Sequence, residues 1–337
     1  MLNSHPSLAI PGESHFIYQL AQLCARAKWP GKLEGDGDWR RLVNYLLSHP
    51  HLQRWQLKQE LLRSRLEGLP RRSHSAAFRA VFEAYSRQQG KALWGDKTPQ
   101  HVQYMLVLDR LFPGSRFIHV VRDGRDVALS LLSRAWGPRH ISLAGHYWSW
   151  LVLSGMVSGA VLGRRRYREV RYEDLVASPQ TALEGLCQWM GLPYSPAMLL
   201  YHQTAAAREY ARGGPAAERL ARPIEVSRLQ RWKAGLSTRQ VRTLIGQAGG
   251  LLAYMGYPVG PLPRRQQARL EELGRLFQAE SVAALSSQAG RQGRVSHLRW
   301  GLLSDRLGQL LALPRGRLAA WARGSLRWQR TVASMLE

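Results

Sequence analysis

The sequence predicts an α/β fold in which a parallel β-sheet is flanked by helices. Phe117–Val121 (FIHVV) is rich in β-branched residues, has the length of a buried strand, and runs toward a helical stretch over 125–134. Tyr167–Tyr172 is a second strand candidate, and a helix is expected to follow it. Strands that alternate with helices in this way are typical of parallel sheets.

The first third of the chain is predicted to be helical. Apolar residues recur every three or four positions over 16–29, 39–66 and 76–89, which is the period of an amphipathic helix. Gly31–Asp38 and Pro70–Ser75 are polar stretches containing Gly or Pro, and we expect them to separate these helices.

Shorter signals predict the elements on either side of the two strands. Ala92–Gly95 is a short apolar run, and a helix is expected to follow over Pro99–Phe112. Ser178-Pro179 indicates a helix start, because Ser caps free N–H groups and Pro fits the first helical position. Gly191 indicates the end of that helix, where a left-handed conformation is common.

Length, charge and cysteine content limit the class of protein. A chain of 337 residues fits one large domain or two modest ones. The net charge of +25, from 48 basic and 23 acidic residues, favours anionic partners such as a nucleotide, a nucleic acid, an acidic glycan or a lipid headgroup. Cys24 and Cys187 stand far apart, so neither a disulfide framework nor a metal site is predicted.

Two stretches raise the question of membrane contact. Ile141–Gly163 has no Asp, Glu, Lys or Arg and could span a bilayer, but its His, Tyr, Ser and Gly residues favour a buried core helix. After Pro263 the chain is an Arg-rich helical extension that we expect to pack on the domain. An oligomer contact or a membrane-surface helix are the alternatives. The residues that suggest these are Leu298, Leu302, Leu303, Leu307, Leu310, Leu311, Trp321 and Trp328.

The segment FIHVVRDGRDVALS has the features of a phosphate site. A strand delivers Arg122 at its carboxyl end, and a helix then begins whose first two turns include Ser130. Ligands of open α/β sheets bind beyond these strand ends, helix N-termini favour phosphate, and an Arg can donate two parallel hydrogen bonds to it. The alternative is that Arg122 only pairs with Asp126 or Asp123.

The same segment resembles a motif of a known family. Arg122 to Asp126, with Ser130 eight residues after Arg122, is similar to the 3′-phosphate-binding motif of sulfotransferases that use 3′-phosphoadenosine-5′-phosphosulfate (PAPS). The resemblance covers residues 1–258 and is greatest to bacterial members related to tyrosylprotein and glycan sulfotransferases. It implies a P-loop-NTPase-like sulfotransferase fold over 1–258, with the basic helical extension over 259–337. The further matching motifs are Trp94–Pro99, Val170–Leu175, Gly191–Tyr194, Arg231-Trp232 and Met255–Tyr257.

The resemblance implies roles at the donor. Arg122 and Ser130 would hold the 3′-phosphate, and Tyr172 would lie beside the adenosine, the alternative being a buried structural tyrosine. Lys97 would lie near the transferred sulfonate, the alternative being a surface ion pair with Asp96. Sulfotransferases of this type need PAPS as co-substrate and no metal.

The resemblance also implies a catalytic base. Glu13, just after a His-Pro segment and a short turn, matches the carboxylate that takes the acceptor's proton, and His15 matches a secondary polar position. The alternative for Glu13 is an acid that favours the dipole of the helix expected from residue 16.

One part of the family pattern is not found in the sequence. Relatives place a strand and a Gly-x-x-Arg-Ser-Gly-Thr-Thr loop, which wraps the 5′-phosphosulfate, before the segment that Met1–Ser4 resemble. We expect that the start was assigned too late or that the sequence is a fragment. The alternatives are an inactive relative, or a chain that functions without the loop.

The sequence therefore predicts an enzyme that transfers a sulfonate from PAPS to a hydroxyl acceptor. A glycan, a tyrosyl peptide, a lipid and a small metabolite all remain open as acceptors, and no specific nucleic acid is expected. We expect a cytoplasmic protein, peripheral to a membrane if the extension binds one. The alternatives are a non-catalytic basic protein that binds anions or nucleotides, and a kinase-like phosphoryl transferase, against which the lack of a Gly-x4-Gly-Lys-Ser/Thr loop argues.

Overall fold

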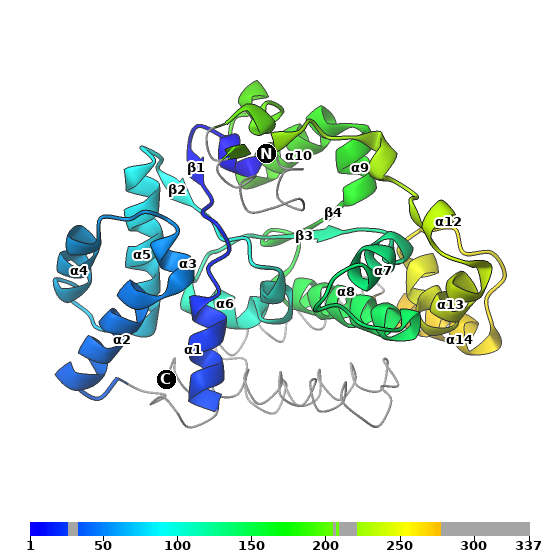
Figure 1. Ribbon diagram of the computed structural model, residues 1–337, viewed down its shortest axis with the longest axis horizontal. Helices are drawn as coiled ribbons and strands as arrows, with labels where there is room; N and C mark the ends of the chain where they lie inside the picture. The colour runs from blue at the N-terminus through cyan, green and yellow to red at the C-terminus, as the bar shows by residue number, and fades with distance from the viewer. Residues whose placement is uncertain (26–32, 205–206, 209–220, 278–337) are drawn as a thin grey trace. The chain divides into compact units, whose positions relative to one another are not determined.

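The computed structural model describes residues 1–25, 33–204, 207–208 and 221–277, and it confirms the predicted α/β class (Figure 1). The chain divides into two compact units, which are described separately. The first unit contains Met1–Ser115 and Pro179–Ile224. The second contains Arg116–Ser178 and the described residues from Glu225 onward.

The first unit is built on a short parallel strand pair. After η1 (Leu2–Ser4), strand β1 (Leu8–Ala9) pairs with β2 (Leu93–Trp94), and Leu8 lies opposite Leu93. β2 falls within the predicted apolar run. Because the two strands are parallel, the segments that follow them leave the same edge of the sheet, although they are more than 80 residues apart in sequence.

Helices make up most of this unit, and one sequence prediction for them is wrong. The helix expected over 39–66 is three helices, because Pro50 has no N–H to donate and the residue before a proline is disfavoured in the α-conformation. Helix α2 therefore ends at Ser48, and Pro50 takes the first position of α3. The helices of this region are α1 (Phe16–Ala25), α2 (Asp36–Ser48), α3 (Pro50–Gln53), α4 (Gln59–Glu67) and α5 (His74–Gln88).

An aromatic core joins these helices to the strands. The ring of Phe16 is fully buried, with its centroid 5.6 Å from that of Phe78, 5.7 Å from Phe82 and 5.8 Å from Trp55. Trp94 of β2 stacks on Phe82 at 4.7 Å. Since Phe16 is the first residue of α1, this packing fixes the start of that helix.

The remaining elements of the first unit follow the predicted helix signals. The expected helix over Pro99–Phe112 is a short η2 followed by α6, and the helix expected after Ser178 begins at Pro179. Gly191 has φ of 68°, and Leu192 N–H donates to the Cys187 carbonyl at 2.9 Å, which confirms the predicted stop. The elements are η2 (Pro99–Gln103), α6 (Met105–Leu111), α10 (Pro179–Met190), η3 (Pro196–Met198) and η4 (Tyr201–Gln203).

The second unit contains the two strands predicted from the sequence. β3 (Phe117–Val121) has the predicted bounds and pairs in parallel with β4 (Tyr167–Arg171). Tyr172, predicted to end the second strand, is instead the first residue of helix α9. The helices in the described part of this unit are α7 (Gly124–Leu132), α8 (Ile141–Leu162), α9 (Tyr172–Ala177), η6 (Val226–Arg228), α12 (Trp232–Gly235), α13 (Thr238–Tyr254) and α14 (Arg264–Leu276).

Helix α8 is the buried helix of this unit, as predicted. Its residues are buried around most of its circumference, and it packs on α7 and α13. One glycine of α8 faces the ring of His119 on β3, and another faces the ring of Tyr167 on β4. A β-carbon on either glycine would collide with the ring that it faces. No helix in the described part of the chain is both long and apolar enough to cross a membrane.

Only the beginning of the predicted basic extension falls within the described residues. Helix α14 packs against α13, and the Gln266 side chain accepts from Gly250 N–H at 3.0 Å and donates to the Gly246 carbonyl at 2.8 Å. The leucines from Leu298 onward, Trp321 and Trp328, on which the predicted oligomer or membrane contact depends, lie outside the described residues.

We predict that Gly124→Ala destabilises the second unit. A β-carbon there would lie 2.7 Å from the ring of Trp148, which also donates to the Arg122 carbonyl at 2.9 Å. Overpacking of this kind costs about 1–3 kcal/mol, measurable by denaturant unfolding. Gly246→Ala is the matched control, because it has no atom within 4 Å and should be neutral or stabilising. Equal stability of the two variants would contradict the prediction.

Candidate active site

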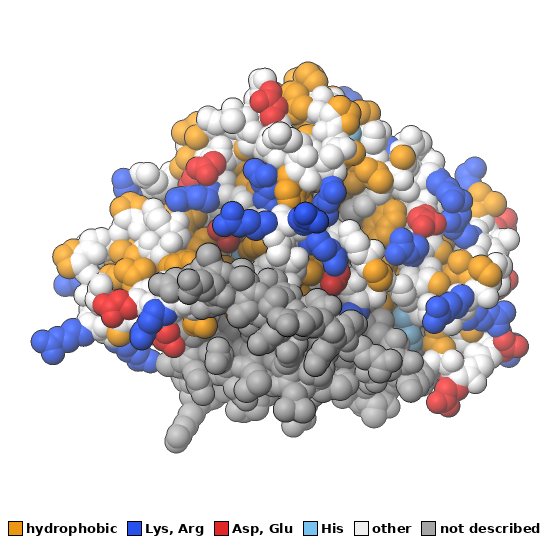
Figure 2. Space-filling model, turned by 180° about the vertical axis from the view of Figure 1, so that it is seen from behind, with side chains coloured by type: hydrophobic (Ala, Val, Ile, Leu, Met, Phe, Trp, Pro, Cys, Tyr) orange, Lys and Arg blue, Asp and Glu red, His pale blue; other side chains and the backbone are white. Residues whose placement is uncertain are grey.

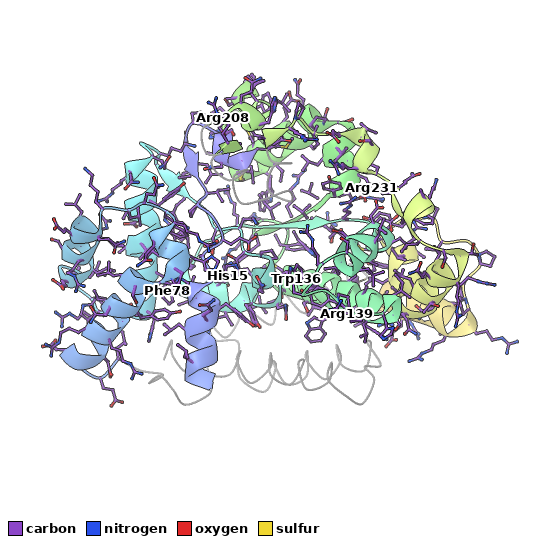
Figure 3. All side chains as sticks on the ribbon, in the orientation of Figure 1. His15, Phe78, Trp136, Arg139, Arg208 and Arg231 are labelled. Carbon is purple, nitrogen blue, oxygen red and sulfur yellow. The ribbon has the colours of Figure 1, made fainter. Side chains whose placement is uncertain are left out.

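Three residues predicted to be catalytic meet at the edge of the first strand pair. Glu13 follows β1 and Lys97 follows β2, and the Lys97 ammonium forms an ion pair with Glu13 Oε1. His15 Nε2 lies 2.9 Å from the other carboxylate oxygen. His15 lies just before α1, toward the middle of the view in Figure 3. The partner of Lys97 is thus Glu13 and not Asp96, which was the alternative.

Asp96 instead connects the loop after β1 with the loop after β2 through hydrogen bonds. Its carboxylate accepts from the Ser14 hydroxyl at 2.6 Å and from the Thr98 hydroxyl at 3.1 Å. Thr98 Oγ1 in turn accepts from the Ser14 backbone N–H at 3.1 Å, and His101 Nδ1 lies 3.3 Å from Asp96. The loop that carries Glu13 is therefore held at the residue that directly follows it. Sequence reasoning missed Ser14, although Asp96 and Thr98 belong to a matching motif.

The charge of Glu13 is set by its neighbours. Burial alone would raise the pKa of this carboxyl, but the hydrogen bond and charge of Lys97, and then those of His15, outweigh burial. The pKa of Glu13 consequently lies below its ordinary value, so the carboxylate is ionised at neutral pH. An ionised carboxylate that is 28% exposed can accept a proton from a bound ligand.

Two further histidines of the same unit lie beside His15, and sequence reasoning missed both. The rings of His15 and His51 have centroids 4.3 Å apart, and His49 lies 5.7 Å beyond His51. His49 Nε2 also lies 2.8 Å from Gln19 Oε1 of α1. Burial, with the charges of the other two histidines, lowers the pKa of His49 to about 4.

The second unit brings together Arg122 and Tyr172 at the carboxyl ends of paired strands. The guanidinium of Arg122 lies over the Tyr172 ring, 4.6 Å from its centroid. One of its terminal nitrogens donates to the Arg228 carbonyl at 2.6 Å and lies 3.3 Å from Asp126 Oδ2. The ion pair with Asp126, one of the two alternatives for Arg122, is therefore present.

Asp126 has other partners, which leaves Arg122 donors available. Its two oxygens accept from the backbone N–H groups of Gln230 at 3.0 Å and Trp232 at 2.9 Å. Within the described part of the chain, Arg122 Nε has no hydrogen-bond partner. Ser130 lies one helical turn beyond Asp126, on the same face of α7, and its side chain is exposed. Arg122 Nε itself is buried, but the Arg122 side chain is 26% exposed, so its guanidinium and the Ser130 hydroxyl are groups that an anion could bind.

A second layer of contacts holds the start of α7. Asp123 accepts from Arg125 through both oxygens, and this pair is buried. Glu173 accepts from the Asp123 backbone N–H at 2.9 Å and from the Tyr257 hydroxyl at 3.0 Å. The Arg125 guanidinium also stacks on Trp232 at 4.0 Å. These contacts join matching motifs that are far apart in the sequence.

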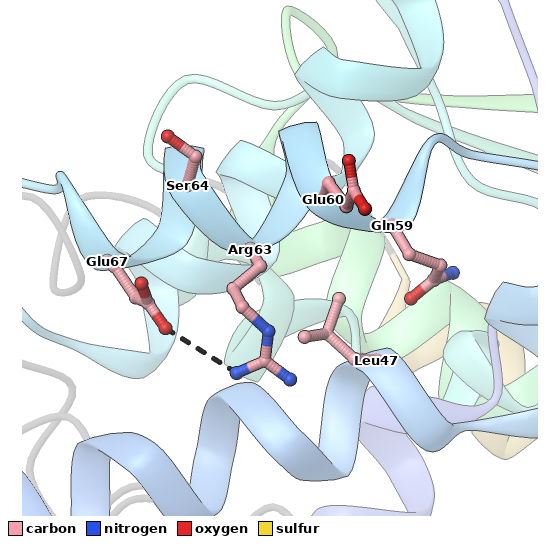
Figure 4. Close-up of a pocket in the computed structure, with 6 residues that line it drawn as sticks. All are labelled: Leu47, Gln59, Glu60, Arg63, Ser64 and Glu67. Carbon is pink, nitrogen blue, oxygen red and sulfur yellow. Dashed lines mark hydrogen bonds and ion pairs between the residues drawn. The ribbon is translucent and has the colours of Figure 1, made fainter.

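Two surface hollows of the first unit lie away from Glu13 and Lys97. One of about 440 Å³ lies on α4, and Leu47 of α2 also lines it (Figure 4). A second of about 670 Å³ adjoins it and shares Leu47 and Arg63. Neither hollow is lined by a predicted site residue. The candidate site is therefore placed at Glu13 and Lys97, because of their chemistry, and not at these hollows. The first is lined by Leu47, Gln59, Glu60, Arg63, Ser64 and Glu67.

Comparison with known proteins decides the family. Residues 1–196, more than half of the chain, match a family model described as "Sulfotransferase family". The chain belongs to the sulfotransferase family. This confirms the family resemblance of the sequence, and Glu13, Lys97, Arg122, Ser130 and Tyr172 all lie within the matched range.

Individual relatives are distant. The chain is 25% identical over 179 residues to protein-tyrosine sulfotransferase 2 of Gallus gallus, covering 48% of this chain and 46% of the relative. It is 26% identical over 203 residues to the nodulation protein NoeE of Sinorhizobium fredii, covering 53% of this chain and 48% of the relative. The chain spans about half the length of these curated relatives.

Two solved sulfotransferase domains are similar to this structure. One is from the Synechococcus PCC 7002 olefin synthase, with a TM-score of 0.43, 20% identity, and coverage of 71% of this chain and 92% of that one. The other is from the curacin biosynthetic pathway, with a TM-score of 0.46, 18% identity, and coverage of 78% of this chain and 92% of that one.

We predict that Lys97→Met raises the pKa of Glu13. The substitution removes the hydrogen bond and the charge that depress this pKa, while burial, which raises it, remains. A ¹³C NMR titration of the side-chain carboxyls measures the change. Lys58→Met, at an exposed position of the same unit, is the control and should leave the Glu13 midpoint in place. An unchanged midpoint in Lys97→Met would contradict the assignment of the ion pair.

Proposed function

We propose that this protein transfers a sulfonate group from PAPS to a hydroxyl acceptor. The observation that carries the proposal is the Glu13 carboxylate, held ionised between Lys97 and His15 at the carboxyl ends of paired parallel strands. Membership of the sulfotransferase family supports it, since members of this family generally use PAPS as the sulfonate donor.

In the proposal, the residues of the second unit bind the donor nucleotide. The partly exposed guanidinium of Arg122 and the exposed hydroxyl of Ser130 fit the oxygens of the 3′-phosphate, to which Arg can donate charge-assisted hydrogen bonds. The Tyr172 ring, already packed under the Arg122 guanidinium, fits a place beside the adenosine. The proposed donor site involves no metal.

The chemical step assigned to Glu13 is proton removal. As the acceptor oxygen forms its bond to sulfur, the bond from sulfur to the bridging phosphate oxygen breaks, and Glu13 takes the hydroxyl proton. The products are a sulfate ester and adenosine 3′,5′-bisphosphate. Transfers of this type have loose transition states with charge on the equatorial oxygens, which Lys97 would stabilise and His15 would assist.

The acceptor is proposed only as a class, a hydroxyl group. Relatives are named as protein-tyrosine sulfotransferases and as a nodulation protein, so a tyrosyl peptide and a glycan both belong among the acceptors to be tested, with a lipid and a small metabolite. Figure 2 shows Lys and Arg side chains distributed over one face, with fewer acidic ones, and the net charge of +25 agrees. Such a surface favours an acidic acceptor.

We predict that Glu13→Gln lowers the rate of sulfonate transfer. The amide keeps the shape of the side chain but cannot accept the acceptor's proton, and loss of a general base typically costs about 10²–10⁴-fold. Transfer from radiolabelled PAPS to the four acceptor classes measures kcat. Glu60→Gln, an exposed acid of α4, is the control and should be fully active. Full activity of Glu13→Gln would exclude Glu13 as the base.

We also predict that adenosine 3′,5′-bisphosphate binds through Arg122 and Ser130. Each hydrogen bond to a charged group contributes about 1.5–3 kcal/mol, so Arg122→Ala and Ser130→Ala should each weaken binding about 10- to 100-fold by calorimetry. Arg168→Ala, which removes an exposed Arg of the same unit, should have no effect. If binding is equally weak in all three and falls steeply with salt, the protein is a non-specific anion binder.

A further inference from the structure

The backbone of His15 is held in an unusual conformation. Its φ is 50°, in the left-handed region that residues with a β-carbon seldom adopt. Such a conformation persists only where the surroundings enforce it, and it often marks a functional site. On one side the Ser14 backbone and hydroxyl are bound by Thr98 and Asp96, and on the other Phe16 is fully buried. The side chain of His15, which is 17% exposed, lies between the Glu13 carboxylate and the ring of His51.

His51 provides the surface on which the ring of His15 rests. The two rings have centroids 4.3 Å apart and are tilted by 39°, which is direct packing of one ring on the other. The backbone and the carboxylate of Glu13 both act to raise the pKa of His51, because Glu13 lies close to this ring. The His51 ring thus packs on one member of the Glu13–His15 hydrogen bond and lies in the electrostatic surroundings of the other.

The position of His51 is fixed independently of any ligand. Pro50 begins the short helix α3 immediately before it, and the preceding His49 is buried and linked to Gln19 of α1 at 2.8 Å. Helix α3 is thereby tied to α1, whose first residue directly follows His15. The ring of His51 is therefore presented to His15 by two helices that pack together.

At neutral pH His51 contributes the packing of its ring on His15 and not a charge. Burial, followed by the charges of His15 and Arg54, lowers the pKa of His51, while its contacts with Glu13 oppose this shift. An uncharged His51 leaves the Glu13 carboxylate with Lys97 as its ion-pair partner. A non-titrating aromatic ring could then reproduce the packing part of the role.

We propose that His51 is a positioning residue for the Glu13 base: it supports the ring of His15 and the turn at Glu13, and so sets the direction of the carboxylate. The inference rests on the proposed function, because it takes Glu13 to be the base of the transfer reaction. A group held this way needs no rearrangement during reaction, and displacement by about 1 Å can lower a rate about 10²-fold.

The test compares His51→Ala, His51→Phe and the control Gln53→Ala, an exposed residue of the same helix α3. His51→Ala should lower kcat about 10- to 100-fold, with KM for PAPS and the affinity for adenosine 3′,5′-bisphosphate unchanged. His51→Phe, which keeps a ring against His15, should recover at least part of kcat. Gln53→Ala should match the unaltered protein. A kcat for His51→Ala within twofold of the unaltered protein would overturn the inference, as would a kcat for His51→Phe as low as that of His51→Ala.

A second measurement separates failure of this inference from failure of the proposed function. If the unaltered protein transfers sulfonate to none of the acceptors, the proposed function fails, and histidine side-chain NMR decides the contact. His51→Ala should then shift the ring signals of His15, whereas Gln53→Ala should not. Unshifted His15 signals in His51→Ala would show that the rings do not pack in solution, which would also overturn the inference.

Discussion

The candidate site depends on carboxylates that accept hydrogen bonds from two separate segments at once. In the first unit Asp96 binds the Ser14 hydroxyl across 82 residues of sequence, which fixes the loop carrying Glu13. In the second unit Asp126 holds the backbone of Trp232 across 106 residues, and Glu173 holds the start of α7. Hydrogen bonds to a charged acceptor contribute about 1.5–3 kcal/mol each. Removing one of these acids would leave buried N–H or O–H groups without a partner. The conformation of the whole loop therefore depends on each acid, and not only the single hydrogen bond.

Local sequence patterns predicted most of the fold where one residue type decides the outcome. The run Phe117–Val121 is a strand with the predicted bounds, and Gly191 ends its helix with the predicted positive φ. The single helix expected over 39–66 is wrong because apolar spacing continues through Pro50, although the missing N–H of that proline ends the helix before it. Tyr172 is the last residue of the strand predicted over Tyr167–Tyr172, and this bound is wrong by one residue. In the folded chain it begins helix α9 at the point where the pairing with β3 ends.

The candidate site residues follow from sequence motifs, and their roles stay predictions, whereas their contacts could not be predicted. The motifs marked Glu13, Lys97 and Arg122, while the spacing along the chain could not show that Lys97 pairs with Glu13. Neighbouring residues of an extended segment point to opposite sides, so Asp96 and Lys97, adjacent in sequence, serve different partners. His51 carries no motif at all, and its packing on His15 depends on how α3 is tied to α1. Only the assembled first unit reveals that contact.

Two strained residues indicate what the carboxylate contacts achieve. His15 and Gln230 both have positive φ, at 50° and 55°. Asp96 binds the residue directly before His15, and Asp126 binds the backbone N–H of Gln230 itself. A left-handed conformation at a residue with a β-carbon costs of order 1–3 kcal/mol, which a charged hydrogen bond can offset. Folding thus supplies the free energy that shapes the loops beside Glu13 and Arg122. A donor that bound to such loops would not have to reorganise them, and this favours the charged state that develops during group transfer over the ground state.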